Sequence, residues 1–399
     1  MGEDARYPAD RGDGRHVTTM AFCQHLLRST EDRLAYRPGL DDAGFAEWRQ
    51  QVRDKLAELL TLSPELIAPG TPPDPAPVRL WSERRDGYRL EKWEAYPEPG
   101  SVVPLLMLVP DTVDDARPGA AVMCFPGSGS SKELLAGEPE LRPEQPPNRH
   151  PVANRMAWYY AKAGLVAVTL DNPGIGELDL LPAGVPPNSG RVKLTAQLLR
   201  LGRSYVELTV SQKLHALAWL RSLPFVDAGR VAVSGHSLGT EPAMCMAVLD
   251  PNLAALVFND FLCHVRQRHV VLGLPRDGQW RDVDPLWHVV PGMFRWFDFP
   301  DLLSSLAGRP LIMTEGGARQ HLDQVRGAYR ERGSARLLEI HHYPRYADPA
   351  ARIHDGDEIP EGLTMEEYFT YANVDVPNHN FKHAVAVPWL VRTLNGSPT

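Results

Sequence analysis

The chain has 399 residues, of which 43% are apolar and 23% charged, so it can bury a substantial core as one large domain or two ordinary ones. Its net charge of −8 gives no basis for binding nucleic acid or an anionic membrane surface. No uncharged apolar run approaches the roughly 18 residues of a membrane span. The charged start of the chain also lacks the apolar stretch of a signal peptide.

The first part of the chain reads as a helical extension ahead of the main domain. Residues 1–16 are polar and rich in Gly, Asp and Arg, and we expect them to be disordered. In residues 17–77, apolar side chains such as Phe45, Trp48 and Val52 recur at helical spacing, and the last ten residues carry five prolines. We expect 17–77 to be a helical cap with a proline-rich linker; its helices could equally form a dimer contact.

From residue 78 onward the pattern changes to strands that alternate with helices. Two short strands flank Asp86-Gly87, which is a hairpin signal, and a third strand follows them. The later apolar runs are typical of strands buried on both faces, with helical stretches between most of them. These features predict that 78–399 is one α/β domain, with a mostly parallel, mixed, eight-stranded sheet and helices on both of its faces.

Two long connections, 178–202 and 262–305, interrupt this alternation. The first is rich in Pro and Gly and then becomes apolar and basic, whereas the second carries many aromatic residues, among them Trp280, Trp287 and Phe294. Connections of this length are typically lids, binding loops or small inserted subdomains. We expect the first connection and the aromatic part of the second to line an apolar, lidded pocket.

The segment Gly235-His236-Ser237-Leu238-Gly239 is the feature that points most directly to chemistry. It follows an apolar strand and precedes a helix that begins near Pro242. A Gly-x-Ser-x-Gly turn between a strand and a helix holds its serine on a sharp, strained turn at the carboxyl edge of the sheet. Ser237 is therefore the predicted nucleophile, and it needs a base and a group that orients this base.

A loop of small residues at 125–130 comes directly after the strand at 120–124. Such a loop leaves room for a backbone N–H to point at the oxygen of a substrate carbonyl. We expect the oxyanion hole to combine the N–H of Leu238, next after the nucleophile, with the N–H of Ser128 from this loop.

The base is expected to be a histidine that follows the last strand. His379 lies in a loop just before the predicted C-terminal helix 384–394, and this place lets a histidine reach back to the serine. His383, one helical turn later, is the alternative base.

The acid is expected between the serine and the histidine in chain order, after the strand before the last one. Glu315 ends the strand 310–314 and is the first choice. Asp260, at the end of the preceding strand, and Asp323, eight residues beyond Glu315, are alternative acids.

With these residues, the chain resembles the α/β-hydrolase superfamily, and within it the acetyl-xylan-esterase-like and dienelactone-hydrolase-like serine esterases. The matching stretches are 124–127, 171–177, 235–239, 306–311 and 378–381. The resemblance implies a Ser–acid–His triad, ester or lactone hydrolysis through an acyl-enzyme, and no cofactor. It carries Ser237 and His379 over directly. Pro126-Gly127 stands where relatives have His-Gly, and Arg319 stands near the place where many relatives have an aspartate.

We therefore expect a carboxylic-ester hydrolase that acts on a small to medium acyl ester or a lactone, with no metal and no nucleic-acid or membrane partner; a homo-oligomer stays open. One alternative keeps the triad but changes the reaction to acyl transfer, carbon–carbon bond hydrolysis or natural-product tailoring, because the fold hosts many chemistries. Another is a non-catalytic binding protein, against which the intact Ser237 and His379 speak. A metal hydrolase lacks a His-x-x-Glu-His motif, and the adjacent His341 and His342 would point to opposite faces of a strand.

The four cysteines form neither a Cys-x-x-Cys pair nor a metal-ligand spacing. Cys124 and Cys245 lie in apolar runs, as is typical of reduced thiols in a core. This usage predicts a reducing compartment, and we expect the protein to be cytoplasmic.

Overall fold

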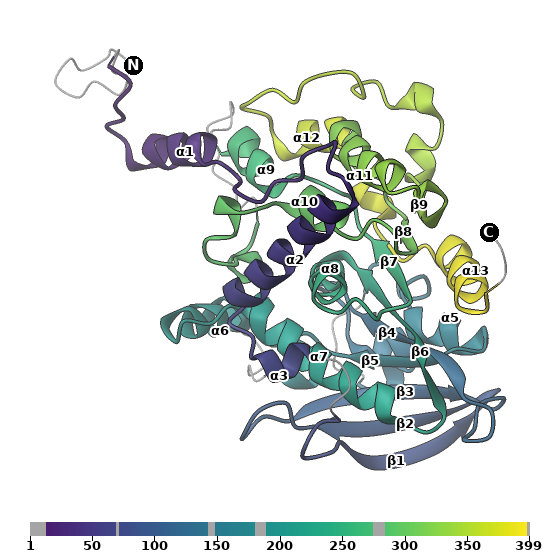
Figure 1. Ribbon diagram of the computed structural model, residues 1–399. Helices are drawn as coiled ribbons and strands as arrows, with labels where there is room; N and C mark the ends of the chain where they lie inside the picture. Colours follow the sequence, from purple (N-terminus) through teal and green to yellow (C-terminus); the bar gives the residue numbers. More distant parts are fainter. Residues whose placement is uncertain (1–12, 69–71, 143–147, 180–188, 274–283, 397–399) are drawn as a thin grey trace.

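The fold is built on one mixed sheet, which the computed structural model describes together with its helices (Figure 1). The described residues are 13–68, 72–142, 148–179, 189–273 and 284–396. The strands are β1 (Val78–Arg85), β2 (Tyr88–Ala95), β3 (Val103–Pro110), β4 (Gly119–Phe125), β5 (Val166–Leu170), β6 (Val226–His236), β7 (Ala255–Asn259), β8 (Leu311–Met313) and β9 (Leu338–Ile340). They lie in the order β1-β2-β3-β5-β4-β6-β7-β8-β9. The pairs from β5 to β9 are parallel and the pairs from β1 to β5 are antiparallel.

The predicted fold class is thus confirmed, but the described sheet has nine strands where eight were expected. Both arms of the hairpin around Asp86-Gly87 belong to this sheet and pair over their whole length. The strand that follows pairs with the second arm, so the antiparallel start alone contributes three strands.

Helices cover both faces of the sheet, because alternate residues of each strand point to opposite faces. Leu105 and Met107 of β3 pack in one core with α2, α7, α8 and α11, and Leu106 and Leu108 pack in another with α4, α5 and α13 (Figure 1). The α-helices of the described chain are α1 (Thr19–Ser29), α2 (Asp42–Leu59), α3 (Pro64–Ile67), α4 (Lys132–Ala136), α5 (Met156–Lys162), α6 (Ser189–Arg200), α7 (Tyr205–Ser222), α8 (Thr240–Leu249), α9 (Val265–Leu272), α10 (Phe299–Ser304), α11 (Arg319–Glu331), α12 (Met365–Tyr371) and α13 (His383–Leu394).

The N-terminal extension is helical and packs on the main domain. α2 begins after Asp41, whose carboxylate accepts the Gly44 N–H at 2.7 Å as a helix cap. Its residues Phe45, Trp48 and Val52 are buried in the same core as α7 and α8. α1 projects from the body at the upper left of Figure 1. The expectation of disorder for 1–16 stays a prediction, because residues 1–12 of this segment lie outside the described ones.

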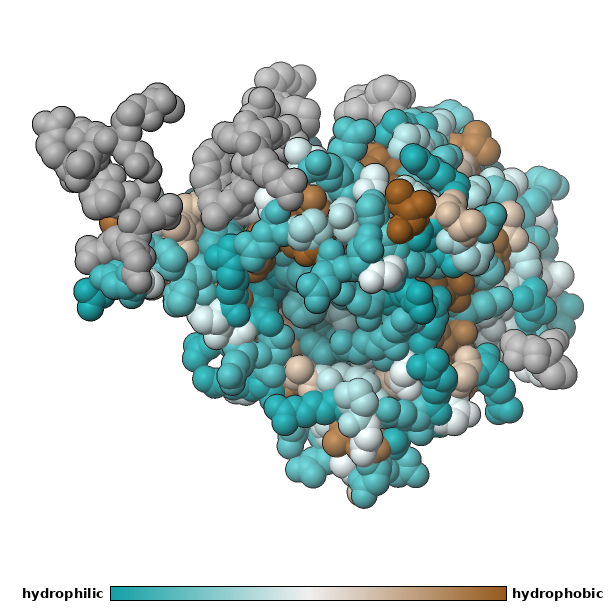
Figure 2. Space-filling model, turned by 90° about the horizontal axis from the view of Figure 1, so that it is seen from above, coloured by the Kyte–Doolittle hydropathy of each residue, from teal (hydrophilic) through white to brown (hydrophobic). Residues whose placement is uncertain are grey.

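The described part of the connection 262–305 forms α9, α10 and two short 3₁₀ turns, η4 (Leu286–His288) and η5 (Met293–Arg295). The Trp280 of this connection lies outside the described residues. Seen from above, the face of the molecule is mainly hydrophilic, with scattered hydrophobic residues (Figure 2). Among the helices of the described chain, none combines the length and the apolar character needed to cross a membrane.

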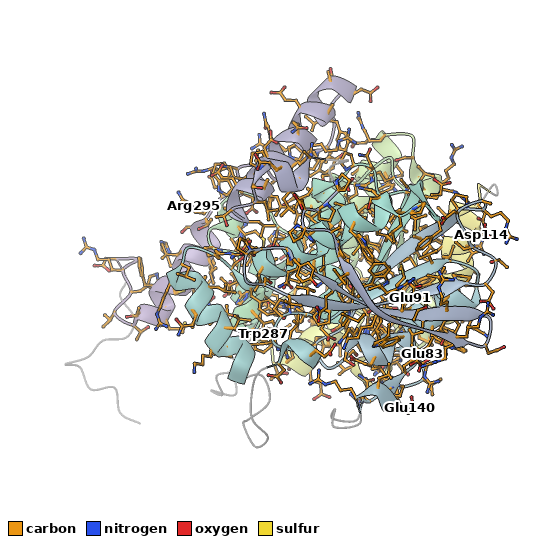
Figure 3. All side chains as sticks on the ribbon, turned by 90° about the horizontal axis from the view of Figure 1, so that it is seen from below. Glu83, Glu91, Asp114, Glu140, Trp287 and Arg295 are labelled. Atoms are coloured by element: carbon orange, nitrogen blue, oxygen red, sulfur yellow. The ribbon has the colours of Figure 1, made fainter. Side chains whose placement is uncertain are left out.

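The hairpin end of the sheet differs in character from the opposite end. In Figure 3, Glu83, Glu91 and Asp114 lie on the side of the molecule away from Trp287 and Arg295 of the connection 262–305. β1 at this edge is largely exposed and carries three arginines and one glutamate, which oppose edge-to-edge pairing with another sheet. The carboxyl ends of β6, β7 and β8 are the part of the sheet that positions functional side chains.

Candidate active site

Ser237 lies at the tip of the turn between β6 and α8. β6 ends one residue earlier, a single 3₁₀ turn follows, and α8 begins at Thr240. The φ of Ser237 is 52°, in the left-handed region that a non-glycine residue adopts only when its surroundings enforce it. The surroundings are tight, because a Cβ at Gly235 would clash with the backbone of Gly239, and one at Gly239 with the carbonyl of Phe125. The predicted strand–turn–helix is therefore present.

The loop after β4 meets this turn. A Cβ added at Gly127 would lie 3.2 Å from the Cβ of Ser237, so the backbone of the loop passes close to the serine. Ser128 and Leu238 line the same cavity as Ser237. The structure thus brings together the two groups that the sequence predicts for the oxyanion hole.

Two buried side chains hold the start of this loop from behind. Asn172 donates from Nδ2 to the carbonyl oxygen of Pro126 at 2.8 Å and accepts from Nζ of Lys213 at 2.9 Å. Lys213 is fully buried with Nζ 5.2 Å from the ring centroid of Phe125, and burial lowers its pKa to about 7. This contact gives a structural role to the stretch 171–177 that the sequence marked without assigning a function.

His379 and Glu315 form a hydrogen-bonded pair beside the serine turn. Glu315 follows β8 and is fully buried, whereas the His379 side chain, in the loop before α13, is 27% exposed. Nδ1 of His379 lies 2.6 Å from Oε2 of Glu315. Because Nδ1 is engaged by the carboxylate, Nε2 is the nitrogen left for a nucleophile. The structure therefore brings the first-choice acid to the first-choice base.

Two further side chains bind the same carboxylate. Tyr343 donates its hydroxyl to Oε2 of Glu315 at 2.8 Å, and Nζ of Lys382 lies 2.5 Å from Oε1. Burial disfavours a charged Glu315, but the hydrogen bond and charge of His379 and the charge of Lys382 outweigh burial and lower the pKa of this carboxyl to about 2. Burial also disfavours a charged His379, and there the bonded carboxylate outweighs burial and raises the pKa of the imidazole.

Asp260, an alternative acid, lies beside this pair without bonding to His379 in the described structure. One of its oxygens, a carboxylate oxygen of Glu315 and a ring nitrogen of His379 all lie within 4.8 Å of one another. Oδ1 of Asp260 accepts only the N–H of Phe261, at 2.8 Å. Burial, together with the charge of Glu315, raises the pKa of Asp260 to about 6.

The other two alternatives do not reach the pair. Asp323 lies on α11, where its carboxylate binds Arg319 at 3.2 Å and Arg326 at 3.1 Å on the surface. The helix begins so soon after β8 that it carries Asp323 away from the strand end. His383 stacks on Tyr159, with the ring centroids 4.1 Å apart, and does not take the place of the base.

Three residues of the site have no counterpart in the sequence prediction: His236, Tyr343 and Lys382. The ring of His236 packs on that of His379, with centroids 4.9 Å apart. Burial and the charge of His379 lower the pKa of His236 to about 3, so it stays neutral. Nearness along the chain was the available signal, since His236 precedes Ser237 and Lys382 follows His379 by three residues; nothing comparable marks Tyr343.

Among the described residues, Asp260, Glu315 and His379 are the one group with metal-ligand spacing. Oε2 of Glu315 already binds Nδ1 of His379 and the hydroxyl of Tyr343, and Oε1 already binds Nζ of Lys382. The ammonium of Lys382 would also repel a cation at this place. The group fits a hydrogen-bonded acid–base pair better than a metal centre.

Ser237, His379 and Asp260 open into one cavity of about 860 Å³. The connection 262–305 supplies more than half of its described lining, including the aromatic side chains of Trp287, Phe294 and Phe299. Cys23, Leu27 and Thr30, from α1 and the residue after it, close another side.

The expectation for 178–202 was wrong for its described part, since none of those residues lines the cavity. Leu194 and Leu198 of α6 instead pack against Trp287 and Leu238. This segment therefore supports the cavity wall from behind.

Comparison with known proteins agrees with this geometry. The sequence model of the Abhydrolase family matches residues 4–392. The crystal structure of a "putative acetyl xylan esterase" from Bacteroides fragilis NCTC 9343 superimposes with a TM-score of 0.85 at 36% identity, over 95% of this chain and 96% of that one. The methylesterase BT1017 superimposes with a TM-score of 0.56 at 14% identity, over 93% and 74% of the two chains, and this match concerns the fold alone. A search of curated proteins found no match.

The sheet, the serine turn and the histidine–carboxylate pair define an α/β-hydrolase. The chain belongs to the Abhydrolase family, and it is a carboxylic-ester hydrolase. The resemblance inferred from the sequence motifs is thereby confirmed.

Proposed function

We propose that the protein cleaves a carboxylic ester or lactone with a small to medium acyl group through an acyl-enzyme on Ser237. The observation that carries the proposal is the bond between His379 and Glu315 beside the cavity that also holds the strained serine. A neutral imidazole that is oriented through Nδ1 presents Nε2 as a general base. The 36% identical relative is named a "putative acetyl xylan esterase", and this name supports a short acyl group.

In this mechanism His379 takes the hydroxyl proton of Ser237 while Oγ attacks the carbonyl carbon. The negative charge on the carbonyl oxygen is received by the N–H groups of Leu238 and Ser128. The imidazolium, stabilised by Glu315, then returns the proton to the leaving alcohol as the ester bond breaks. A water molecule repeats the sequence on the acyl-enzyme, which releases the acid and restores Ser237.

A fluorophosphonate ester tests this proposal, since it labels only an activated serine. We expect mass spectrometry to find one equivalent of label on Ser237, and hydrolysis of p-nitrophenyl acetate to stop as labelling proceeds. Ser237→Ala should take up no label while its circular dichroism stays that of the wild type. A folded wild-type protein that is not labelled at Ser237 contradicts the proposal.

We also infer a cytoplasmic location. The inference is supported by the four cysteines, which are all free thiols, three of them buried. Fractionation of the native source, with detection of the full-length chain, tests this inference; recovery outside the cytoplasm contradicts it.

A further inference from the structure

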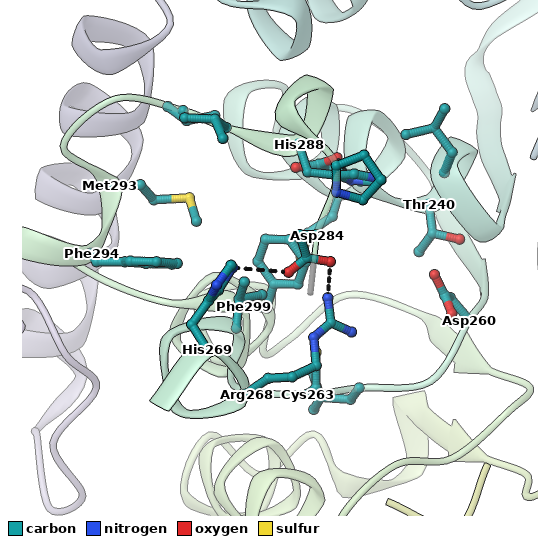
Figure 4. A pocket seen from close by; sticks show the side chains of 18 of the residues that line it. Thr240, Asp260, Cys263, Arg268, His269, Asp284, His288, Met293, Phe294 and Phe299 are labelled. Atoms are coloured by element: carbon teal, nitrogen blue, oxygen red, sulfur yellow. Dashed lines mark hydrogen bonds and ion pairs between the residues drawn. The ribbon is translucent and has the colours of Figure 1, made fainter. Parts of the chain in front are cut away.

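The wall of the catalytic cavity carries a group of ionisable side chains that the proposed mechanism does not use. Glu241 comes from α8, Arg268 and His269 from α9, and Asp284 and His288 from the segment that ends in η4; all five line the cavity. We call these five residues the polar cluster. Figure 4 shows Arg268, His269 and Asp284 gathered together, with His288 above them.

The members of the polar cluster bind one another in pairs. Nδ1 of His288 lies 2.9 Å from Oε2 of Glu241. Asp284 forms an ion pair with Arg268, and its Oδ2 lies 3.2 Å from Nε2 of His269 (Figure 4). Nε of Arg268 is buried without a partner among the described residues, so the cluster has hydrogen-bonding capacity left over.

The charges of the polar cluster nearly balance. Burial disfavours a charged Asp284, but the hydrogen bond from His269 and the charge of Arg268 outweigh it and lower the pKa of this carboxyl to about 2. Burial also disfavours a charged His288, and the charge of Glu241 outweighs it and raises the pKa of this imidazole. Two carboxylates therefore face one guanidinium and two imidazoles, and the pKa of one of these imidazoles is raised.

Stability alone gives no reason for this arrangement. Removing charged groups from water is costly, and well-packed apolar residues in place of a buried ion pair are often neutral or stabilising. Away from the catalytic residues most of the cavity wall is apolar or aromatic, with Met293, Phe294 and Phe299 among its residues (Figure 4). A few polar groups in an otherwise apolar pocket are what fixes the orientation of a bound molecule.

The cavity has room for more than the acyl group of an ester. Its volume of about 860 Å³ far exceeds that of a short acyl group. Sites for whole small molecules have volumes of roughly 300–1,000 Å³. The room beyond the acyl group is therefore available to the alcohol portion of the ester.

We propose that the polar cluster is a subsite for the alcohol portion of the substrate, and that it recognises a hydroxyl-rich alcohol such as a polyol or a sugar. A hydroxyl both donates and accepts hydrogen bonds, so it suits a wall with carboxylates and cationic donors side by side. An anionic group would call for an excess of positive charge, and a cationic group for an excess of negative charge. The inference rests on the proposed ester hydrolysis at Ser237.

Two esters that differ only in their hydroxyls test the subsite: glycerol monoacetate and propyl acetate, followed by release of acetate. We expect wild-type kcat/KM to be about 10-fold higher for glycerol monoacetate, as for a charge-assisted hydrogen bond. Xylitol should compete with propyl acetate better than 1-pentanol does, and this comparison needs no variant. Equal kcat/KM values for the two esters would overturn the proposal. So would a hydroxyl on the acyl side, as in propyl glycolate, that raises kcat/KM more than the hydroxyls of glycerol monoacetate do.

Variants then assign the preference to the cluster. Asp284→Asn and His288→Gln should lower the ratio of the two kcat/KM values about 10-fold. Asp250→Asn is the matched control, because it breaks an ion pair with Arg221 of similar burial outside the cavity, and its ratio should stay that of the wild type. A folded Asp284→Asn and His288→Gln with an unchanged ratio would overturn the subsite.

Fluorophosphonate labelling keeps the two proposals apart. If the variants label at Ser237 and hydrolyse propyl acetate while the ratio stays constant, the subsite fails and the proposed function stands. If the wild type neither labels nor hydrolyses either ester, the proposed function fails, and the subsite falls with it.

Discussion

Glu315 and Asp260 stand at the ends of two neighbouring parallel strands, β8 and β7, and both lie within 4.8 Å of His379. Their protonation nevertheless differs widely, since the pKa of Glu315 is about 2 and that of Asp260 about 6. Glu315 receives His379, a tyrosine hydroxyl and an ammonium, whereas Asp260 receives one backbone N–H. The donors around each carboxylate therefore decide how readily it ionises, and the one with more donors is also the one bonded to the imidazole.

Removing the charge of Glu315 should have the largest effect. We expect Glu315→Gln to lower kcat for p-nitrophenyl acetate about 10³- to 10⁴-fold, because an amide neither stabilises the imidazolium nor fixes its tautomer. Asp323→Asn, an acid eight residues later on the surface of α11, should keep wild-type activity. Loss of less than about 10-fold in a folded Glu315→Gln would mean that Asp260 can replace Glu315, and that the comparison of the two carboxylates is wrong.

Removing one hydrogen-bond donor from Glu315 should weaken the difference between Glu315 and Asp260 without abolishing it. Tyr343→Phe deletes the hydroxyl bond to Glu315 and should lower kcat about 10-fold, as expected for a hydrogen bond to a charged group. Tyr329→Phe is the control, since this buried tyrosine donates to the carbonyls of Leu306 and Arg309 away from the site. Both variants should unfold at lower temperature, but Tyr329→Phe should keep its kcat. Equal losses of kcat would assign Tyr343 to stability alone.

Lys382 is expected to act mainly on the pH dependence. Its charge opposes the imidazolium, so Lys382→Met should raise the pKa of His379 and move the acid limb of kcat/KM to higher pH, by up to about one unit. Glu315 should remain ionised, because its pKa starts far below the working range. Lys382→Arg should restore the wild-type profile. A shift of the acid limb to lower pH would contradict this account.

The fold and the core of the site followed from local patterns. Apolar runs, turn residues and the Gly-x-Ser-x-Gly segment report on neighbours in sequence, and they sufficed for the sheet, the serine turn and the place of His379. Glu315 was found by its position after a strand, because the carboxyl ends of parallel strands meet at one edge. The same rule ranked Glu315 first, because its strand is the one before the last, and it kept Asp260, at the end of the preceding strand, as an alternative.

What the sequence missed depends on contacts between distant segments. Lys382 reaches Glu315 across 67 residues and Tyr343 reaches it across 28, and no periodic pattern encodes such a meeting. The wrong expectation for 178–202 has the same cause, since loop length shows that a segment covers the sheet but not which side of a cavity it takes. The polar cluster likewise forms only when α8, α9 and η4 come together.

The smallest effect should come from Asp260, and its sign provides the sharpest test of the comparison. Above about pH 6 Asp260 is ionised and helps to raise the pKa of His379, so Asp260→Asn should lower that pKa and move the acid limb of kcat/KM to lower pH. This direction is opposite to that of Lys382→Met. Below pH 6 Asp260 is largely neutral, and the variant should approach the wild type. Plateau activity should change less than about 3-fold, because the bond between Glu315 and His379 persists. If Asp260→Asn lost as much activity as Glu315→Gln, the imidazole would depend on both carboxylates, and the donor count would not distinguish them.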